Sequence, residues 1–220
     1  MEIEKILKDS LDVFMKNIVA FIIGTLIALI GSILIVTIAP LFYGIVYMAV
    51  KGIKGEKVEI GDVFAGFKVP GAFVQSWIVF CVLLASIVVL VILGIVGYVY
   101  SLLFSSETIL VIIAALAFVI KIVATIMQSL ILIYAMPLLV TRRYAGKDAL
   151  KEAAKLIQSN LTDTIILFLI FIFSNFIGYL LLSIIRLPPI IGLLLTLPIS
   201  MIVCILVVQN LTGEKPTWET

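Results

Sequence analysis

Histidine is absent from this 220-residue chain, and cysteine occurs only twice. Without histidine, the sequence lacks the most common metal ligand and the side chain that most often transfers protons near neutral pH. Cys81 and Cys204 both lie inside apolar stretches, and their spacing matches neither a zinc motif nor a disulfide framework. We therefore expect no metal site, and we interpret both cysteines as small packing residues.

Catalytic and nucleotide-binding motifs are lacking as well. The sequence has no glycine-rich nucleotide-binding loop, no paired carboxylates and no nucleophile beside a base. We therefore expect a protein that is not an enzyme, with no catalytic residues, no cofactor and no nucleic-acid partner.

Charged residues are scarce, at 13% of the chain, while 64% of the residues are apolar. A soluble domain usually carries about 25% charged residues. So many apolar side chains cannot be buried in one small soluble domain, whereas lipid removes the need for a polar surface. The charges gather in short windows between long uncharged stretches, as in multi-span membrane proteins. We expect one all-α integral membrane domain over residues 1–220, and residues 1–17 are too polar for a cleaved signal peptide.

Three polar windows carry apolar side chains at helical spacing and predict amphipathic helices on the membrane surface. The first covers residues 2–16, with Leu7, Leu11 and Phe14 expected to face inward. The third covers residues 147–160, with Ala153, Ile157 and Leu161 expected to face inward. The second, shorter window has an apolar stripe of Ile60, Val63, Phe64 and Phe67.

Long apolar stretches between these windows predict about six membrane spans. Residues 18–52 are too long for one span, so we predict a hairpin with arms 13–30 and 33–53; the alternative is one long span kinked at Pro40. The next two arms, 72–104 and 109–140, each reach about 48 Å, against about 30 Å of hydrocarbon. The last two spans, 165–185 and 190–208, are separated by a turn at residues 186–189.

The order of these features repeats and predicts three units, at about residues 1–57, 58–146 and 147–215. Each unit has a surface helix followed by a two-span hairpin. The returning helices carry Pro40, Pro137 and Pro198, which we predict to kink them.

Basic residues indicate the orientation in the membrane. With six spans, 13 of the 15 Lys and Arg residues fall on one side, leaving Arg186 opposite and Lys121 within a span. The positive-inside rule makes the basic side cytoplasmic. We therefore predict a multi-pass protein of the cell membrane with both termini in the cytoplasm.

Several short motifs resemble those of a known group of proteins. They are the run Pro40-Leu41-Phe42-Tyr43-Gly44, the run Asp62-Val63-Phe64-Ala65-Gly66-Phe67, and Pro137-Leu138-Leu139-Val140 followed by Ala149-Leu150-Lys151-Glu152-Ala153. Over about residues 5–210 the chain resembles prokaryotic six-span membrane proteins of domain-of-unknown-function families. These look related to the membrane domain of some glycerophosphodiester phosphodiesterases. The resemblance implies a fold and supplies no catalytic residue.

Two stripes of polar residues inside apolar helices are candidate intramembrane sites. Lys121, Thr125 and Gln128 form one stripe, and Asn175 and Tyr179 form the other. A charge deep in the bilayer often marks a functional site, but Lys121 could also extend to the interface. The second stripe could serve only for hydrogen bonds between helices.

A basic patch beside a span end is the candidate binding site for anionic lipid headgroups. Its residues are Arg142, Arg143, Lys147, Lys151 and Lys155. We expect membrane lipids as partners, and a second copy of the chain packed against the overlong middle hairpin. The favoured function is a structural or accessory bundle that binds lipid or a membrane partner. The alternative is a small-solute transporter or channel using Lys121, Gln128 and Asn175.

Overall fold

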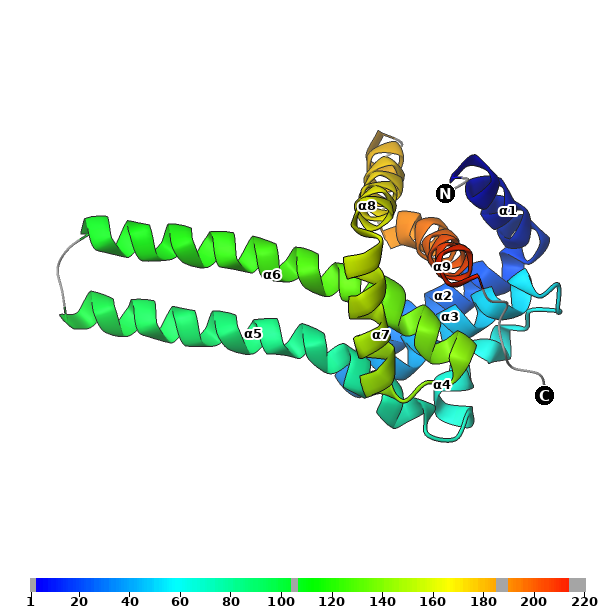
Figure 1. The fold of residues 1–220 in the computed structure, drawn as a ribbon, viewed down its shortest axis with the longest axis horizontal. Coiled ribbons are helices and arrows are strands. Elements are labelled where there is room, and N and C mark those ends of the chain that lie inside the picture. Colours follow the sequence, from blue (N-terminus) through cyan, green and yellow to red (C-terminus); the bar gives the residue numbers. More distant parts are fainter. Residues whose placement is uncertain (1–2, 104–106, 185–189, 214–220) are drawn as a thin grey trace.

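All regular secondary structure in the described part of the chain is helical, so the expected all-α fold is confirmed. The computed structural model describes residues 3–103, 107–184 and 190–213 (Figure 1). The predicted turn at 186–189 and the tail beyond residue 213 lie outside them, as do residues 105 and 106 of the predicted turn at 105–108. Residues 107 and 108 of that turn are the first two of a helix. The helices are α1 (Ile3–Lys16), α2 (Ile18–Gly31), η1 (Ile35–Thr37), α3 (Ile38–Ile53), η2 (Ile60–Phe64), α4 (Ala65–Lys68), α5 (Ala72–Leu103), α6 (Glu107–Arg142), α7 (Gly146–Ser159), α8 (Leu161–Ile184) and α9 (Ile190–Thr212).

Sharp bends join a polar segment to an apolar one at three places. The angle is 86° between α1 and α2, 89° between η2–α4 and α5, and 105° between α7 and α8. Each bent pair is followed by a helix that carries proline: α3, α6 or α9. The described chain therefore repeats one order of elements three times.

Helix α3 forms the centre of the packed body, with eleven of its sixteen residues buried. Glycines let its neighbours approach closely. A Cβ at Gly44 would overlap the carbonyl of Val63, and one at Gly66 would overlap the backbone of Pro40. The segment η2–α4 therefore runs back along α3. Of its predicted stripe only Val63 is buried, while Ile60, Phe64 and Phe67 are exposed.

The surface helices bury faces that differ from the predicted ones. Helix α1 buries Ile6, Ser10 and Phe14, and the prediction that Leu11 faces inward is wrong, since Leu11 is 49% exposed. Packing of α1 against α9 selects the face that contains Ser10, whose hydroxyl is satisfied by the Ile6 carbonyl at 2.6 Å. Helix α7 buries Gly146, Ala149, Ala153 and Leu156. Its predicted partner Leu161 is 55% exposed, because it lies beyond the bend, in α8.

The first hairpin is shorter than predicted. Its first arm begins at Ile18 and not at residue 13, because the chain bends at Asn17. At 14 and 16 residues, α2 and α3 are about 21 and 24 Å long, less than the hydrocarbon thickness of about 30 Å. Their turn lies at the base of α5, where Trp77 Nε1 donates to the Val36 carbonyl at 3.0 Å.

The three prolines occupy different positions in their helices. Pro40 lies in the first turn of α3, where it starts the helix and does not interrupt its interior hydrogen bonds. Pro137 and Pro198 lie inside α6 and α9. Thr141 Oγ1 donates to the Pro137 carbonyl, one turn earlier in α6, at 2.7 Å.

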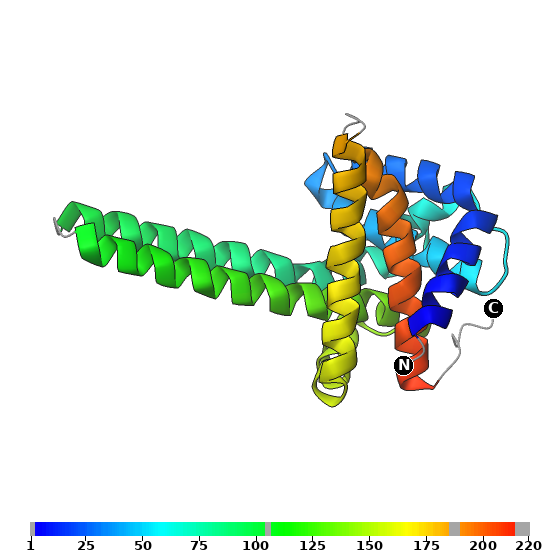
Figure 2. The same ribbon diagram turned by 90° about the horizontal axis from the view of Figure 1, so that it is seen from above.

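The α5–α6 hairpin projects far from the rest of the molecule, as Figures 1 and 2 show. Its arms of 32 and 36 residues are about 48 and 54 Å long. Helix α5 continues without interruption through Gly94 and Gly97. Many apolar side chains along the projection are exposed, among them Val91, Ile95, Val111, Leu116 and Phe118.

These helices are those of a membrane protein. In the described part of the chain, three helical segments are long and apolar enough to cross a bilayer: η1 together with α3 (Ile35–Ile53), Ala114–Arg142 and Gly192–Thr212. There are up to six spans if each bent pair counts as one. Figure 2 shows α8 and α9 running across the direction of the α5–α6 hairpin. The packed body therefore surrounds α3 and α9, while the hairpin extends from it as a separate arm.

Candidate functional site

The polar stripe predicted on α6 lies along the projecting hairpin. Lys121 and Thr125 are exposed there. Gln128 Nε2 donates to the Val82 carbonyl at 2.8 Å and so links α6 to α5. The role shown for Gln128 is a hydrogen bond between two neighbouring helices.

The second predicted stripe lies on α8, and the side chains of Asn175 and Tyr179 are outside the described part of the structure. Helices α6 and α8 meet near one end of each, through a buried contact of 3.0 Å between the hydroxyls of Tyr134 and Thr164. Beyond this contact they diverge (Figures 1 and 2). The two stripes are therefore not brought together on facing helices.

The predicted basic patch divides into an outer face and a group at the end of α6. Lys147, Lys151 and Lys155 follow one another at intervals of four on the exposed face of α7, where Lys155 pairs with Glu152 at 3.3 Å. At the end of α6, Arg142 donates to the Tyr144 hydroxyl at 3.1 Å and lies 5.8 Å from the centre of its ring. Arg143 is exposed.

Arg143 also lines a cavity that the sequence did not predict. This hairpin-base cavity encloses about 370 Å³ between α3, the bend that precedes α5, and the end of α6. Its polar lining comes from segments far apart in sequence: Tyr43, Lys68, Gln75, Arg143 and Tyr144. Apart from Arg143, no sequence signal could have grouped them, because the bends that bring them together depend on the tertiary fold.

The polar groups of the hairpin-base cavity are mainly hydrogen-bond donors. Gln75 Oε1 accepts the backbone N–H of Gly146 at 2.6 Å, so its Nε2 group is left to donate elsewhere. The Tyr144 hydroxyl accepts from Arg142, so its own hydrogen can be donated. Among the residues that the structure describes, the lining includes the cations Lys68 and Arg143 and no carboxylate. This arrangement favours an anion.

Two residues that line this cavity have a left-handed backbone conformation. Arg143 has φ of 50°, and Gly71 on the opposite side has φ of 78°. A left-handed conformation disfavours a residue with a side chain, such as arginine, by about 1–2 kcal/mol relative to the right-handed one. Glycine would avoid that strain at position 143, so arginine at this position costs some stability.

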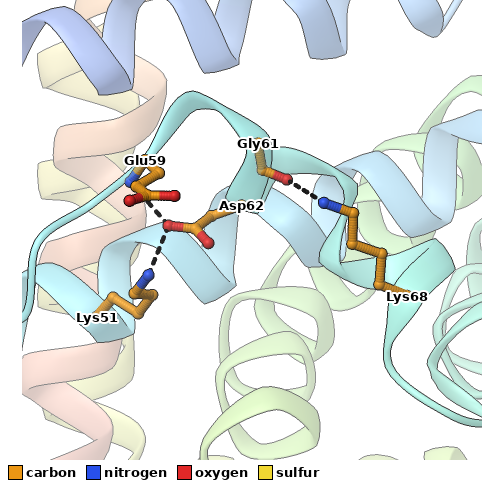
Figure 3. A network of polar contacts seen from close by, with 5 residues as sticks. All are labelled: Lys51, Glu59, Gly61, Asp62 and Lys68. Carbon is orange, nitrogen blue, oxygen red and sulfur yellow. Dashed lines mark hydrogen bonds and ion pairs between the residues drawn. The ribbon is translucent and has the colours of Figure 1, made fainter.

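A network beside the same segment holds η2–α4 against α3, as Figure 3 shows. Lys51 Nζ lies 2.9 Å from Asp62 Oδ2, which also accepts the Glu59 backbone N–H at 2.8 Å. Lys68 Nζ donates to the Gly61 carbonyl at 3.3 Å. These contacts position Lys68 at the edge of the hairpin-base cavity.

A second cavity occupies the corresponding place in the first repeat. This first-bend cavity encloses about 490 Å³ between the α1–α2 bend and the segment that follows α3. Its charged lining is Lys16, Lys57 and Glu59. Each cavity thus has one cation at or beside a bend, Lys68 or Lys16. Each also has one cation from the chain after the returning helix, Arg143 or Lys57. Only the first-bend cavity has a carboxylate, that of Glu59, which caps η2.

No family model, curated protein or solved structure matches the chain. Among the described residues, no group of three or more Cys, Asp or Glu side chains is placed to hold a metal ion. Function must therefore be inferred from the local chemistry, and that chemistry is cationic and donor-rich at the base of an apolar hairpin.

Proposed function

We propose that the protein is a non-enzymatic membrane bundle with a structural or accessory role, which binds anionic lipids around the base of its α5–α6 hairpin. The observation that carries this proposal is the position of cationic groups beside the exposed apolar hairpin. Lipid chains would cover the apolar arms, and lipid headgroups would meet Arg143 and the lysines of α7. Each basic residue near an anionic membrane surface contributes about 1 kcal/mol to binding.

The positive charge of Arg143 and of the α7 lysines also supports a cytoplasmic position for the hairpin base and the termini, by the positive-inside rule. We retain the prokaryotic six-span membrane proteins as the proposed group of relatives. The transport alternative has less support, because α6 and α8 diverge beyond Tyr134 and Thr164 and Gln128 already bonds to α5.

Native mass spectrometry of the protein extracted from its host membrane would test lipid binding. We expect bound phospholipids to be richer in anionic headgroups than the bulk membrane. Replacing Lys147 and Lys151 with glutamine should reduce that enrichment. Replacing Lys5 and Lys8 of α1, which lies on another side of the body (Figure 1), should reduce it less. Retained lipids with the composition of the bulk membrane would contradict the proposal.

A further inference from the structure

The hairpin-base cavity lies where an interfacial ligand would be held. It is bordered by the first residues of α5 and the last of α6, at the end of the apolar arms. Tyr43 and Tyr144 line it, and Trp77 lies one turn beyond Ala72 and Phe73 on α5. Aromatic side chains with a polar atom concentrate at the headgroup level of membranes. The cavity thus combines an interfacial composition with a volume of about 370 Å³, within the range of about 300–1,000 Å³ usual for small-ligand sites.

The charge and hydrogen-bonding pattern specifies the ligand further. Arg143 offers a planar guanidinium that can form two parallel bonds to a phosphate, and Lys68 adds a second, compact charge. The Tyr144 hydroxyl and the Gln75 amide supply neutral donors, for the reasons given above. A carboxylate ligand would satisfy fewer of these donors than a phosphate, which has more acceptor oxygens.

We propose that the hairpin-base cavity binds one phosphate group, carried either by a lipid headgroup or by a small soluble phosphate compound. The proposal rests on the lipid-binding function above and gives it a defined site. Arg143 and Lys68 neutralise the phosphate, while Tyr144 and Gln75 donate to its oxygens. The first-bend cavity binds phosphate more weakly, because Glu59 repels it there.

A thermal-stability measurement on the purified full chain in neutral detergent would test the site. The added probes are short-chain phosphatidylglycerol, short-chain phosphatidylcholine, and inorganic phosphate. Binding to the folded state stabilises it by RT ln(1 + L/Kd), where L is the free ligand concentration, and the melting temperature rises accordingly. We expect phosphatidylglycerol to raise it more than phosphatidylcholine if the ligand is an anionic lipid. An equal rise with inorganic phosphate alone would identify a soluble phosphate compound.

Two variants separate binding from folding. Arg143→Gly removes the charge while permitting the positive φ, so it should fold at least as stably as the parent. It should weaken binding of the effective probe by about tenfold or more, as expected for a lost charge-assisted hydrogen bond. The control Lys8→Gln removes one positive charge from the exposed face of α1, away from the cavity, and should leave binding within about twofold.

Three results would overturn the assignment of this site. They are an unchanged rise in melting temperature in Arg143→Gly, equal losses of that rise in both variants, and no rise with either anionic probe. The proposed function has a separate readout in the lipids that co-purify with the protein. If Arg143→Gly loses the thermal response but keeps its anionic lipids, the cavity and the wider basic surface act independently. If wild type retains no anionic lipid but responds to inorganic phosphate, only the lipid function fails.

Discussion

Small residues at helix crossings determine how tightly the packed body closes. Gly44 and Gly66 allow α3 to touch η2–α4 at distances that no side chain permits, since their Cβ atoms would overlap Val63 and Pro40. Gly94 and Gly97, in contrast, have no such neighbours within 4 Å. Glycines of the same chain thus have different roles, which sequence alone cannot distinguish.

This difference predicts opposite effects of two alanine substitutions. Gly44→Ala should destabilise the fold by about 2 kcal/mol or more, because a backbone carbonyl cannot move aside as a side chain can. Gly94→Ala should be neutral or stabilising by up to about 1 kcal/mol, because alanine favours helix. Thermal unfolding in detergent would compare them, and equal melting temperatures for the two variants would contradict the close α3–η2 packing.

At the level of elements, the sequence predicted where the helices lie better than it predicted which of their faces are buried. Apolar length and the charged windows were enough to predict the helical segments, whereas the three sharp bends of 86°, 89° and 105° between polar and apolar segments are seen only in the structure. The inward face of α1 was predicted wrongly because burial of Ser10 depends on a local bond to Ile6, and Leu11 remained outside. The buried face of a short polar helix depends on the element it packs against, and that element lies far away in sequence.

The hairpin-base cavity illustrates the same limit for a site. Arg143 was predicted from the local cluster of basic residues, whereas Tyr43 and Gln75 look like ordinary members of apolar helices. Their grouping depends on the bend before α5 and on the close packing of α3. No spacing along the chain contains that information.

The η2–α4 element should depend strongly on one ion pair. The side chains of Lys51 and Asp62 are 18% and 17% exposed, and Asp62 also accepts the Glu59 N–H. Asp62→Ala should therefore destabilise the protein by about 1–3 kcal/mol. Glu152→Ala removes a carboxylate from a pair whose lysine is 72% exposed and should cost less than about 1 kcal/mol.

Limited proteolysis between residues 54 and 70, together with melting temperatures, would check this prediction. Faster cleavage in Asp62→Ala than in Glu152→Ala is expected, because η2 would separate from α3 more often. Equal cleavage rates in the two variants would show that the ion pair does not hold this segment.

At the scale of the whole molecule, a compact body carries the α5–α6 hairpin, whose helices are about 48 and 54 Å long and have their base packed into the core. The body has a buried core around α3 and α9. Apolar side chains are exposed along the arm and also on α2, η1 and α8. Apolar surface in water costs about 25 cal/mol per Å², so the arm requires a cover of lipid or of a second copy. Lipid covering is the central premise of the proposed function.

Orientation can be tested with single cysteines in a Cys81→Ser background, since Cys204 is buried. Lys57→Cys and Lys147→Cys should react with an impermeant maleimide from the cytoplasmic side only, because both lie in basic windows. Reaction of the two positions from opposite sides would exclude the proposed topology.

The most direct measurement of lipid covering is the collision accessibility of nitroxide labels along the arm in reconstituted bilayers. Labels would be attached to Leu116→Cys and Phe118→Cys, whose parent side chains are 63% and 64% exposed, and to Lys147→Cys as the control in water. Oxygen concentrates in hydrocarbon, while a neutral nickel chelate remains in water. We expect both arm positions to collide more often with oxygen than with the chelate, and Lys147→Cys to show the reverse. Arm positions as accessible to the chelate as Lys147→Cys would contradict a lipid-embedded hairpin.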